Sequence, residues 1–256
     1  MPRKASARIG PAKSSPAKPH ISHQTWHSWE CRRAAVRCQN MSTVGIIGAG
    51  NIGFNVAKAA IAAGHRVVIS NSRGPDTLHD TIDQLGHSHA RAATVEEAAR
   101  AGDLVLVAVP LHAIRDLPRE PLEDTVVLDA TNYYPERDGR IATLDSNLST
   151  TSELLQRHLP HSHVVKAFNH INAKDIPAHG LPAGTEDRRA LAIAGADPGA
   201  KAVVRAFLDT LGYDAVDLGG LSKSWRVERD TPAYGVRMNA EQLKEAVATT
   251  KRVHQH

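Results

Sequence analysis

Three features that define other classes of protein are missing or scarce in this chain of 256 residues. Its two cysteines, Cys31 and Cys38, lie near the start, so the remainder has no disulfide to maintain, which suits a cytoplasmic protein. No apolar run approaches the ~20 residues needed to cross a bilayer, and residues 1–40 lack the apolar core of a secretory signal. Aromatic residues are few, but the length and the ordinary apolar and charged fractions are sufficient for one substantial core.

Positive charge is concentrated at the start of the chain. Residues 1–40 contain eight basic residues and one acid, a net charge of +7, so residues 41–256 carry −3 of the total of +4. The first segment is rich in Pro, Ser, Ala and Lys, and we expect it to be disordered. We expect one folded domain over 41–256, beginning at Met41. Residues 1–40 would then be an upstream extension, an unstructured arm or a transit peptide.

Neither nucleic acid nor metal is an expected partner. The basic character belongs to the leader, and nothing behind it suggests a nucleic-acid surface. Cys31 and Cys38 match no zinc-ligand spacing, so we expect no metal site.

A strand, a glycine-rich turn and a helix follow one another where the expected domain begins. The apolar segment 43–47 leads into Gly48-Ala-Gly-Asn-Ile-Gly53, and residues 54–64 have a helical pattern. A G-x-G-x-x-G segment in this context is typical of dinucleotide binding. A glycine-rich turn without a ligand is the alternative.

Each position of this turn has a physical role in the dinucleotide hypothesis. Gly48 permits the tight turn, Gly50 lets the backbone approach the pyrophosphate, and Gly53 lets helix and sheet pack closely. The free N–H groups at Asn51 and Ile52, at the positive end of the helix dipole, would hold the pyrophosphate.

The end of the second expected strand indicates which nucleotide is bound. An NAD-preferring site has Asp or Glu there, about 20 residues beyond the glycines, to accept the ribose 2′-hydroxyl. This chain has Asn71, Ser72 and Arg73, with no acid before Asp76. A guanidinium can bind a 2′-phosphate through two charge-assisted hydrogen bonds, so NADP(H) is favoured over NAD(H). The alternative is a polar turn in which Arg73 is a solvated charge and Asp76 a helix N-cap.

Strands and helices alternate along the rest of the chain. This order predicts an α/β fold, a Rossmann-type doubly wound, mostly parallel sheet with a small C-terminal extension. The expected strands are 43–47, 67–70, 91–93, 104–109, 126–128, 164–168, 191–194 and 215–217, and the expected helices 54–64, 76–86, 94–101, 152–159, 197–211 and 239–251.

Ligands of such sheets lie beyond the carboxyl ends of the strands. The loops at Asn71, Pro110, Thr131 and Asn169 all follow expected strands and are therefore predicted to wall one cleft. Lys166, within a strand, is expected to be a solvated residue. Turn or cap roles are expected for Asp103 and Asp129.

Six segments together resemble the NADPH-dependent coenzyme F-420 reductase family, whose members transfer hydride between NADP(H) and an 8-hydroxy-5-deazaflavin. The resemblance spans Thr43 to about Gly235. It is carried by Gly48–Gly53 (GAGNIG), Ser70–Pro75 (SNSRGP), Val107–Pro110 (VAVP), Asp129–Asn132 (DATN), Val164–Asn169 (VVKAFN) and Thr231–Gly235 (TPAYG).

The resemblance implies an NADP-dependent oxidoreductase whose second substrate is coenzyme F-420. Asn71, Ser72 and Arg73 match the grip on the 2′-phosphate, and Val109 and Pro110 match the wall beside the nicotinamide half.

On the acceptor side, Asn169 and His170 match the loop between nicotinamide and deazaflavin. They are the catalytic candidates, by orientation and polarisation only, and no nucleophile or acid–base dyad is expected. This chain reads Phe168-Asn-His-Ile-Asn172 where deazaflavin reductases of the family read more like Leu-His-Thr-Ile-Pro. The imidazole is shifted by one residue, which leaves the acceptor less defined than the cofactor. The alternative for His170 is an ordinary strand-end histidine.

Other interpretations stay open. Trp225, Arg226 and Arg229 are expected either to meet an anionic aromatic acceptor or to be a packed tryptophan amid surface charges. The protein could reduce another small electron acceptor, or be a non-catalytic NADP(H) sensor. A ketone or imine reductase with a long helical second domain is disfavoured by the short segment after the last strand. A homodimer is expected by analogy.

Overall fold

The computed structural model describes Met1 and residues 42–252. The predictions for the leader, for a start at Met41 and for the two cysteines lie outside the described residues.

The described chain forms one eight-stranded sheet with the order β3-β2-β1-β4-β5-β6-β7-β8. All neighbouring strands are parallel except β6 and β7, which are antiparallel. The strands are β1 (Thr43–Ile47), β2 (Arg66–Ser70), β3 (Ala90–Ala92), β4 (Leu104–Val107), β5 (Val126–Asp129), β6 (His163–Lys166), β7 (Ala190–Gly195) and β8 (Asp214–Asp217). This confirms the predicted Rossmann-type fold, in which the strand order reverses between β1 and β4.

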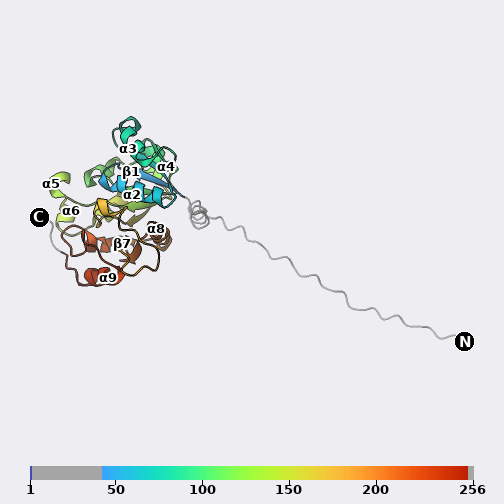
Figure 1. Ribbon diagram of the computed structural model, residues 1–256. Helices are drawn as coiled ribbons and strands as arrows, with labels where there is room; N and C mark the ends of the chain where they lie inside the picture. Colours follow the sequence, from blue (N-terminus) through green and yellow to red (C-terminus); the bar gives the residue numbers. More distant parts are fainter. Residues whose placement is uncertain (2–41, 253–256) are drawn as a thin grey trace.

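Helices cover both faces of the sheet, as Figure 1 shows. Packing of the buried apolar side chains places α2, α3 and α8 on one face and α4, α7 and α9 on the other. The helices are α2 (Asn51–Ala62), α3 (His79–Leu85), α4 (Val95–Ala101), α5 (Pro135–Asp138), α6 (Ala142–Asp145), α7 (Thr151–His158), α8 (Pro198–Thr210) and α9 (Ala240–Thr249). Short 3₁₀ helices are η1 (Pro75–Leu78), η2 (Leu111–Asp116), η3 (Glu120–Leu122), η4 (Ala173–Asp175) and η5 (Leu221–Val227).

The central strands are apolar on both sides because each face carries helices. In β1, Ile46 packs into the core beneath α2, whereas Ile47 packs into the core of the opposite face with Val105 and Val107 of β4. The C-terminal extension also covers one face of the sheet with a helix, because Leu243 and Val247 of α9 pack against β7 and β8.

Three predicted helix starts are confirmed by their caps. Thr94 forms the expected capping box with Glu97, and Asn239 forms one with Gln242. The Asp197 side chain accepts from two backbone N–H groups at the start of α8. Each cap satisfies donors that a helix leaves free in its first turn.

Other boundaries differ from the prediction. Helix α2 begins at Asn51 rather than at residue 54, because Gly50 already serves as its N-cap. Strand β6 ends at Lys166, short of the expected Phe168, whose φ of 62° is incompatible with an extended strand. The expected helix over 76–86 opens as η1, and the short helices α5 and α6 were not predicted.

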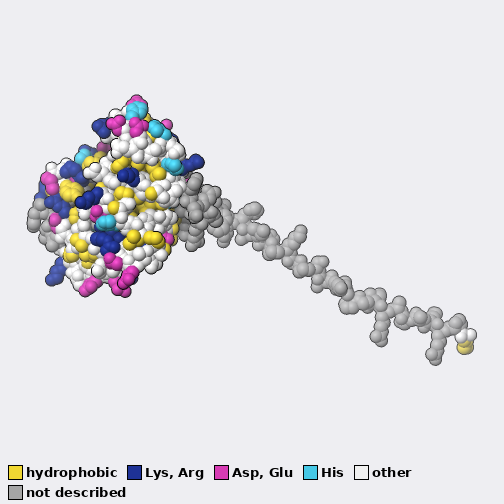
Figure 2. Space-filling view, in the orientation of Figure 1, with side chains coloured by type: hydrophobic (Ala, Val, Ile, Leu, Met, Phe, Trp, Pro, Cys, Tyr) yellow, Lys and Arg dark blue, Asp and Glu magenta, His cyan; other side chains and the backbone are white. Residues whose placement is uncertain are grey.

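None of the helices within the described residues is long and apolar enough to span a membrane. On the face drawn in Figure 2, acidic and histidine side chains gather over α3 at the top, and acidic side chains gather again around α9 at the bottom.

Candidate functional site

The glycine turn after β1 has three glycines in three different environments. Gly48 has a φ of 110°, and a Cβ there would overlap the carbonyl oxygen of Ala108 at the end of β4. A Cβ on Gly53 would overlap the carbonyl oxygen of Gly48. Around Gly50, in contrast, a Cβ would meet no atom within 4 Å. Gly48 and Gly53 are therefore needed by the turn itself, whereas the space beside Gly50 is open.

The helix that follows this turn has a free N-terminus. No side chain caps α2, and no group in the described part of the chain accepts from the N–H of Asn51 or Ile52. The 12-residue helix directs the positive end of its dipole here, and its first turn contains no acidic residue. This arrangement of backbone donors fits a phosphate group.

The segment after β2 is held by the side chain of Asn71. Its Oδ1 accepts from the backbone N–H of Arg73 at 2.9 Å, and its Nδ2 donates to Thr77 Oγ1 at 2.9 Å. Ser72 and Arg73 are exposed, and the Arg73 guanidinium has no hydrogen-bond or ion-pair partner among the described residues. Asp76 caps no α-helix; it lies in the first turn of η1, whose N-cap is Gly74.

The end of β4 lies directly beside the glycine turn. The Ala108 N–H donates to the carbonyl of Ile47 at 2.9 Å, and a Val109 methyl lies close to Gly48. Pro110 is exposed, and Leu111 after it is buried against Tyr133. The structure thus brings the glycine turn, Val109 and Pro110 together at the reversal of strand order.

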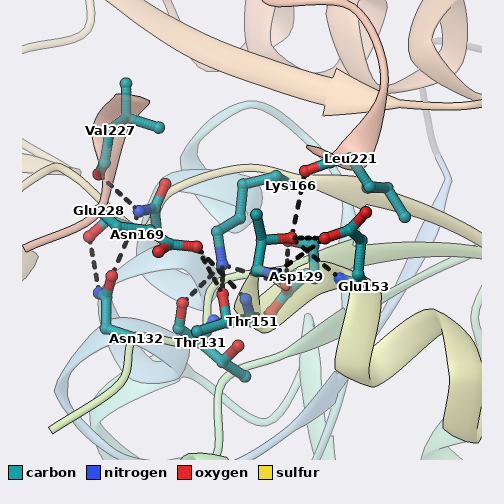
Figure 3. Close-up of polar contacts among 12 residues, drawn as sticks. Asp129, Thr131, Asn132, Thr151, Glu153, Lys166, Asn169, Leu221, Val227 and Glu228 are labelled. Carbon is teal, nitrogen blue, oxygen red and sulfur yellow. Dashed lines mark hydrogen bonds and ion pairs between the residues drawn. The ribbon is translucent and has the colours of Figure 1, made fainter. Parts of the chain in front are cut away.

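The loops after β5 and β6 are joined by an asparagine pair. Asn132 Nδ2 donates to the carbonyl of Asn169 at 2.8 Å, and Asn169 Nδ2 donates to Asn132 Oδ1 at 3.2 Å and to the carbonyl of Val227 at 2.8 Å (Figure 3). Asn169 is 3 % exposed, and its Oδ1 accepts no hydrogen bond from the described residues.

His170 is buried in the interior, at 2 % exposure. Its Nε2 accepts from the backbone N–H of Ala192 in β7 at 2.9 Å, so the neutral ring carries its proton on Nδ1. Burial lowers the pKa of His170 to about 4. The imidazole therefore ties the loop after β6 to β7, and a role in polarising an acceptor stays a prediction.

The prediction for Lys166 is wrong. Its side chain is completely buried, and Nζ donates to Thr131 O at 2.6 Å, Thr151 Oγ1 at 2.8 Å and Asp129 Oδ2 at 3.1 Å. Figure 3 shows the amino group pointing among these three partners. Burial of the ammonium group is tolerated because its three donors are satisfied and a carboxylate neutralises its charge.

Asp129 has the predicted turn role and a second role besides. Its Oδ1 accepts from the backbone N–H of Thr131 at 2.8 Å, and its Oδ2 accepts from Ser152 Oγ at 2.6 Å as well as from Lys166. Asp129 and Lys166 are register partners on adjacent strands. Together they fix both the N–H and the carbonyl of Thr131. A lysine inside an otherwise apolar strand, facing an aspartate on the next strand, was the sequence signal for this pair.

A small pocket of about 10 Å³, with room for about one water molecule, lies next to this network and is lined by Tyr133, Leu144, Asn147, Ser149, Trp225, Glu228, Arg229, Thr231 and Arg252. Two guanidinium groups lie over the indole of Trp225, that of Arg226 at 4.6 Å and that of Arg252 at 5.8 Å from its centroid. Arg229 forms an ion pair with Glu136 at 2.8 Å. This environment matches the packed-tryptophan alternative more closely than an open stacking face.

Comparison with known proteins agrees with the geometry of the nucleotide side. Residues 43–133 match the family described as "NADP oxidoreductase coenzyme F420-dependent". A crystal structure of the hypothetical protein SMa0349 from Sinorhizobium meliloti is 30 % identical, covers 80 % of this chain and 98 % of its own, and superposes with a TM-score of 0.68. A candidate F-420-dependent NADP reductase from Arthrobacter sp. FB24 is 26 % identical over 72 % of this chain and 87 % of its own, with a TM-score of 0.61.

The chain belongs to this family of NADP oxidoreductases. Its match to the Escherichia coli K12 protein YjhV is 39 % identical over 54 residues, which is 21 % of this chain and 39 % of YjhV. Family membership assigns the oxidoreductase class and NADP, but not the electron acceptor.

Proposed function

We propose that this protein transfers a hydride between NADPH and a flat, deazaflavin-type acceptor such as coenzyme F-420. The observation that carries the proposal is the N-terminus of α2, which lies at the reversal of strand order with Arg73 at the end of the neighbouring strand; within the described residues, no side chain caps this helix and none pairs with Arg73. The N-terminus of α2 supplies backbone donors for a pyrophosphate, and Arg73 supplies a cation for a 2′-phosphate.

The nucleotide would be bound along the carboxyl ends of β1, β2 and β4. The N–H groups of Asn51 and Ile52 would hold the pyrophosphate, and Arg73 the 2′-phosphate, with Asn71 shaping its turn. Ser72 would add a short donor beside Arg73. The open space at Gly50 fits a close approach of the nucleotide to the backbone.

The nicotinamide half would rest against Val109 and Pro110, facing the loops that Asn132 and Asn169 join. Bound NADPH supplies the hydride, and the protein supplies orientation and exclusion of water. Asn169, whose Oδ1 accepts from none of the described residues, would orient the reacting rings. His170 would act indirectly, by fixing the backbone of this loop against β7.

The family description and the Arthrobacter relative support the deazaflavin as acceptor. The test is NADPH oxidation by purified protein, followed by absorbance, with and without oxidised deazaflavin. The proposal requires rapid oxidation only when the deazaflavin is present. NADPH binding without turnover would instead favour a non-catalytic sensor. Turnover with imines or ketones alone would show that the acceptor is not a deazaflavin.

A further inference from the structure

A histidine held by a buried aspartate lies at the edge of the sheet where the ligand is expected. His112 is in η2, two residues after Pro110, and Asp138 is the last residue of α5, which follows β5. The pair therefore joins the loops that follow two adjacent strands, β4 and β5. Because these strands are parallel, both loops leave the carboxyl edge of the sheet, where folds of this type bind their ligands.

The imidazole of His112 is oriented through one of its two nitrogen atoms. Nδ1 lies 3.1 Å from Asp138 Oδ1, and the His112 backbone N–H donates to the same oxygen at 3.4 Å. An ionised carboxylate only accepts, so Nδ1 carries a proton in both the neutral and the charged ring. Nε2 has no hydrogen-bond partner among residues 42–252, and the His112 side chain is 45 % exposed. The nitrogen that gains and loses the titrating proton is thus the one without a partner.

Asp138 is held as a carboxylate. Its side chain is completely buried, and its oxygens also accept from Arg137 Nη2 at 2.8 Å, from Arg137 Nε at 3.0 Å and from the Tyr134 backbone N–H at 3.0 Å. Burial alone would raise the pKa of Asp138, but the hydrogen bonds from Arg137, Tyr134 and His112 outweigh it and hold the pKa below its ordinary value. Asp138 therefore stays ionised where histidine titrates, and keeps the imidazole in one orientation.

Arg137 connects this histidine–aspartate pair to the asparagine pair. Its Nη2 also donates to the backbone carbonyl of Asn132 at 2.9 Å, and Asn132 is bonded to Asn169 after β6. One network of hydrogen bonds therefore links the loops after β4, β5 and β6. His112 is on the β4 side of this network, two residues beyond the wall proposed for the nicotinamide, Val109–Pro110.

The elements around the imidazole contribute other charged groups. Helix α7 packs against η2, and α6 shares a core cluster with it. The titratable and charged side chains of these elements are Arg115 and Asp116 in η2, Tyr134 before α5, Glu136 and Arg137 in α5, Asp145 in α6, and Glu153, Arg157 and His158 in α7. Asp145 pairs with Arg140, and Glu153 caps α7. Of the residues that the structure describes, Asp138 alone bonds to the imidazole.

We propose that His112 is the general acid that protonates the acceptor during its reduction. The inference rests on the proposed hydride transfer. When the hydride of NADPH adds to a carbon of the acceptor, an electron pair moves through the conjugated system to a nitrogen or oxygen atom. That atom takes the proton from Nε2 of the imidazolium, so one N–H bond breaks and a new N–H or O–H bond forms. The neutral imidazole, still donating to Asp138 through Nδ1, then recovers a proton from solvent.

The proposal adds an acid–base pair that was not expected from the sequence, because His112 and Asp138 are 26 positions apart and share no motif. It also restricts the chemical class of the acceptor. The carbon that receives the hydride must be conjugated to a basic nitrogen or a carbonyl oxygen, as in a deazaflavin ring or an imine. One-electron acceptors do not meet this requirement.

The first test compares His112→Gln with the matched control His87→Gln. His87 is also an exposed histidine paired with an aspartate, Asp83, but it lies between α3 and the start of β3, at the opposite edge of the sheet. NADPH oxidation with oxidised deazaflavin is measured across about pH 5 to 9. In wild type and His87→Gln, kcat should fall as pH rises through the range in which histidine titrates, about pH 5 to 8.

In His112→Gln, kcat at the acid end of this range should be about 100-fold lower than in wild type, and the fall with rising pH should be absent. The Kd for NADPH should be unchanged. The acceptor is the same in every assay, so its own titration is common to wild type and both variants.

Chemical rescue separates proton transfer from a structural role. His112→Ala leaves space at an exposed position, so imidazole added to the buffer should restore kcat in proportion to the concentration of imidazolium. Wild type and His87→Gln should not respond to imidazole. A slow His112→Ala variant that imidazole does not rescue would overturn the proposal, because loss of local structure alone would have that effect.

Equal kcat values and equal pH profiles in wild type and His112→Gln would also overturn the proposal, while leaving hydride transfer intact. If wild type reduced no acceptor at all, the proposed function would fail together with this inference.

Discussion

The two halves of the candidate site are built in opposite ways. On the nucleotide side, the groups that would bind a ligand are backbone N–H groups at the start of α2 and the exposed Arg73, and none of them has a partner among residues 42–252. On the side of β5 and β6, buried side chains satisfy one another around Lys166 and Asp129. The first half would be preformed for the charged ligand proposed above, whereas the second half is a fixed wall.

The difference also determines where a mutation acts. Removing a group from the nucleotide side should change affinity and leave the free energy of unfolding unchanged. Removing a group from the wall should lower the free energy of unfolding, because a buried polar partner would be left without compensation.

The largest expected effect is at Lys166. The variant Lys166→Met leaves the buried Asp129 carboxylate without its cation and should destabilise the protein by about 3–5 kcal/mol in urea unfolding. The control Lys201→Met removes the partly exposed pair with Asp217, which should cost at most about 1 kcal/mol. The double variant Lys166→Met with Asp129→Asn should recover part of the loss. Equal, small losses for Lys166→Met and Lys201→Met would contradict a fixed wall.

A pH change should affect the wall almost as strongly. The folded pKa of His170, about 4, lies below its ordinary value of 6.5, so the unfolded chain takes up the proton first as pH falls. Stability should therefore decline between about pH 6.5 and 4, by up to about 3 kcal/mol from this group. His170→Gln should weaken that dependence, whereas His87→Gln, at an exposed residue, should leave it unchanged. If the free energy of unfolding had the same pH dependence in both variants, the low pKa assigned to folded His170 would be wrong.

The next effect is on nucleotide affinity. Arg73→Ala should weaken NADPH binding by about 1.5–3 kcal/mol, the range for a hydrogen bond to a charged group, and leave NADH binding and stability nearly unchanged. Arg66→Ala, which removes an exposed arginine from the start of β2, is the control and should affect neither nucleotide. Equal losses for NADPH and NADH in Arg73→Ala would refute the 2′-phosphate role.

The smallest effects distinguish two glycines of one turn. Gly53→Ala places a methyl group against the carbonyl of Gly48 and should lower stability by about 1–3 kcal/mol. Gly50→Ala has free space and should leave the melting temperature unchanged, yet weaken NADPH binding about tenfold by obstructing the nucleotide. Loss of stability in both variants would show that the space at Gly50 belongs to the fold rather than to a ligand.

Much of the nucleotide side could be predicted from the sequence because it is local. The glycine spacing, the absence of an acid at the end of β2, and the caps at Thr94, Asp197 and Asn239 all lie within short segments. Local geometry of this kind depends on few residues, so it can be recognised from a single sequence.

The wall could not be predicted in the same way. Lys166, Thr151 and Glu228 come together only after β6, α7 and η5 pack, and a lysine considered alone favours an exposed position. The position of His170 was predicted, but its bond to β7 required knowledge that β7 lies beside β6 in antiparallel orientation. Long-range pairing therefore separates what was predicted from what was missed.

The measurement that tests this account most directly is a crystal structure of the complex with NADP⁺. The account predicts the pyrophosphate on the N–H groups of Asn51 and Ile52, the 2′-phosphate in hydrogen-bond contact with Arg73, and the Lys166 network unchanged beside the nicotinamide. A 2′-phosphate in solvent, away from Arg73, or a nucleotide bound elsewhere would contradict it.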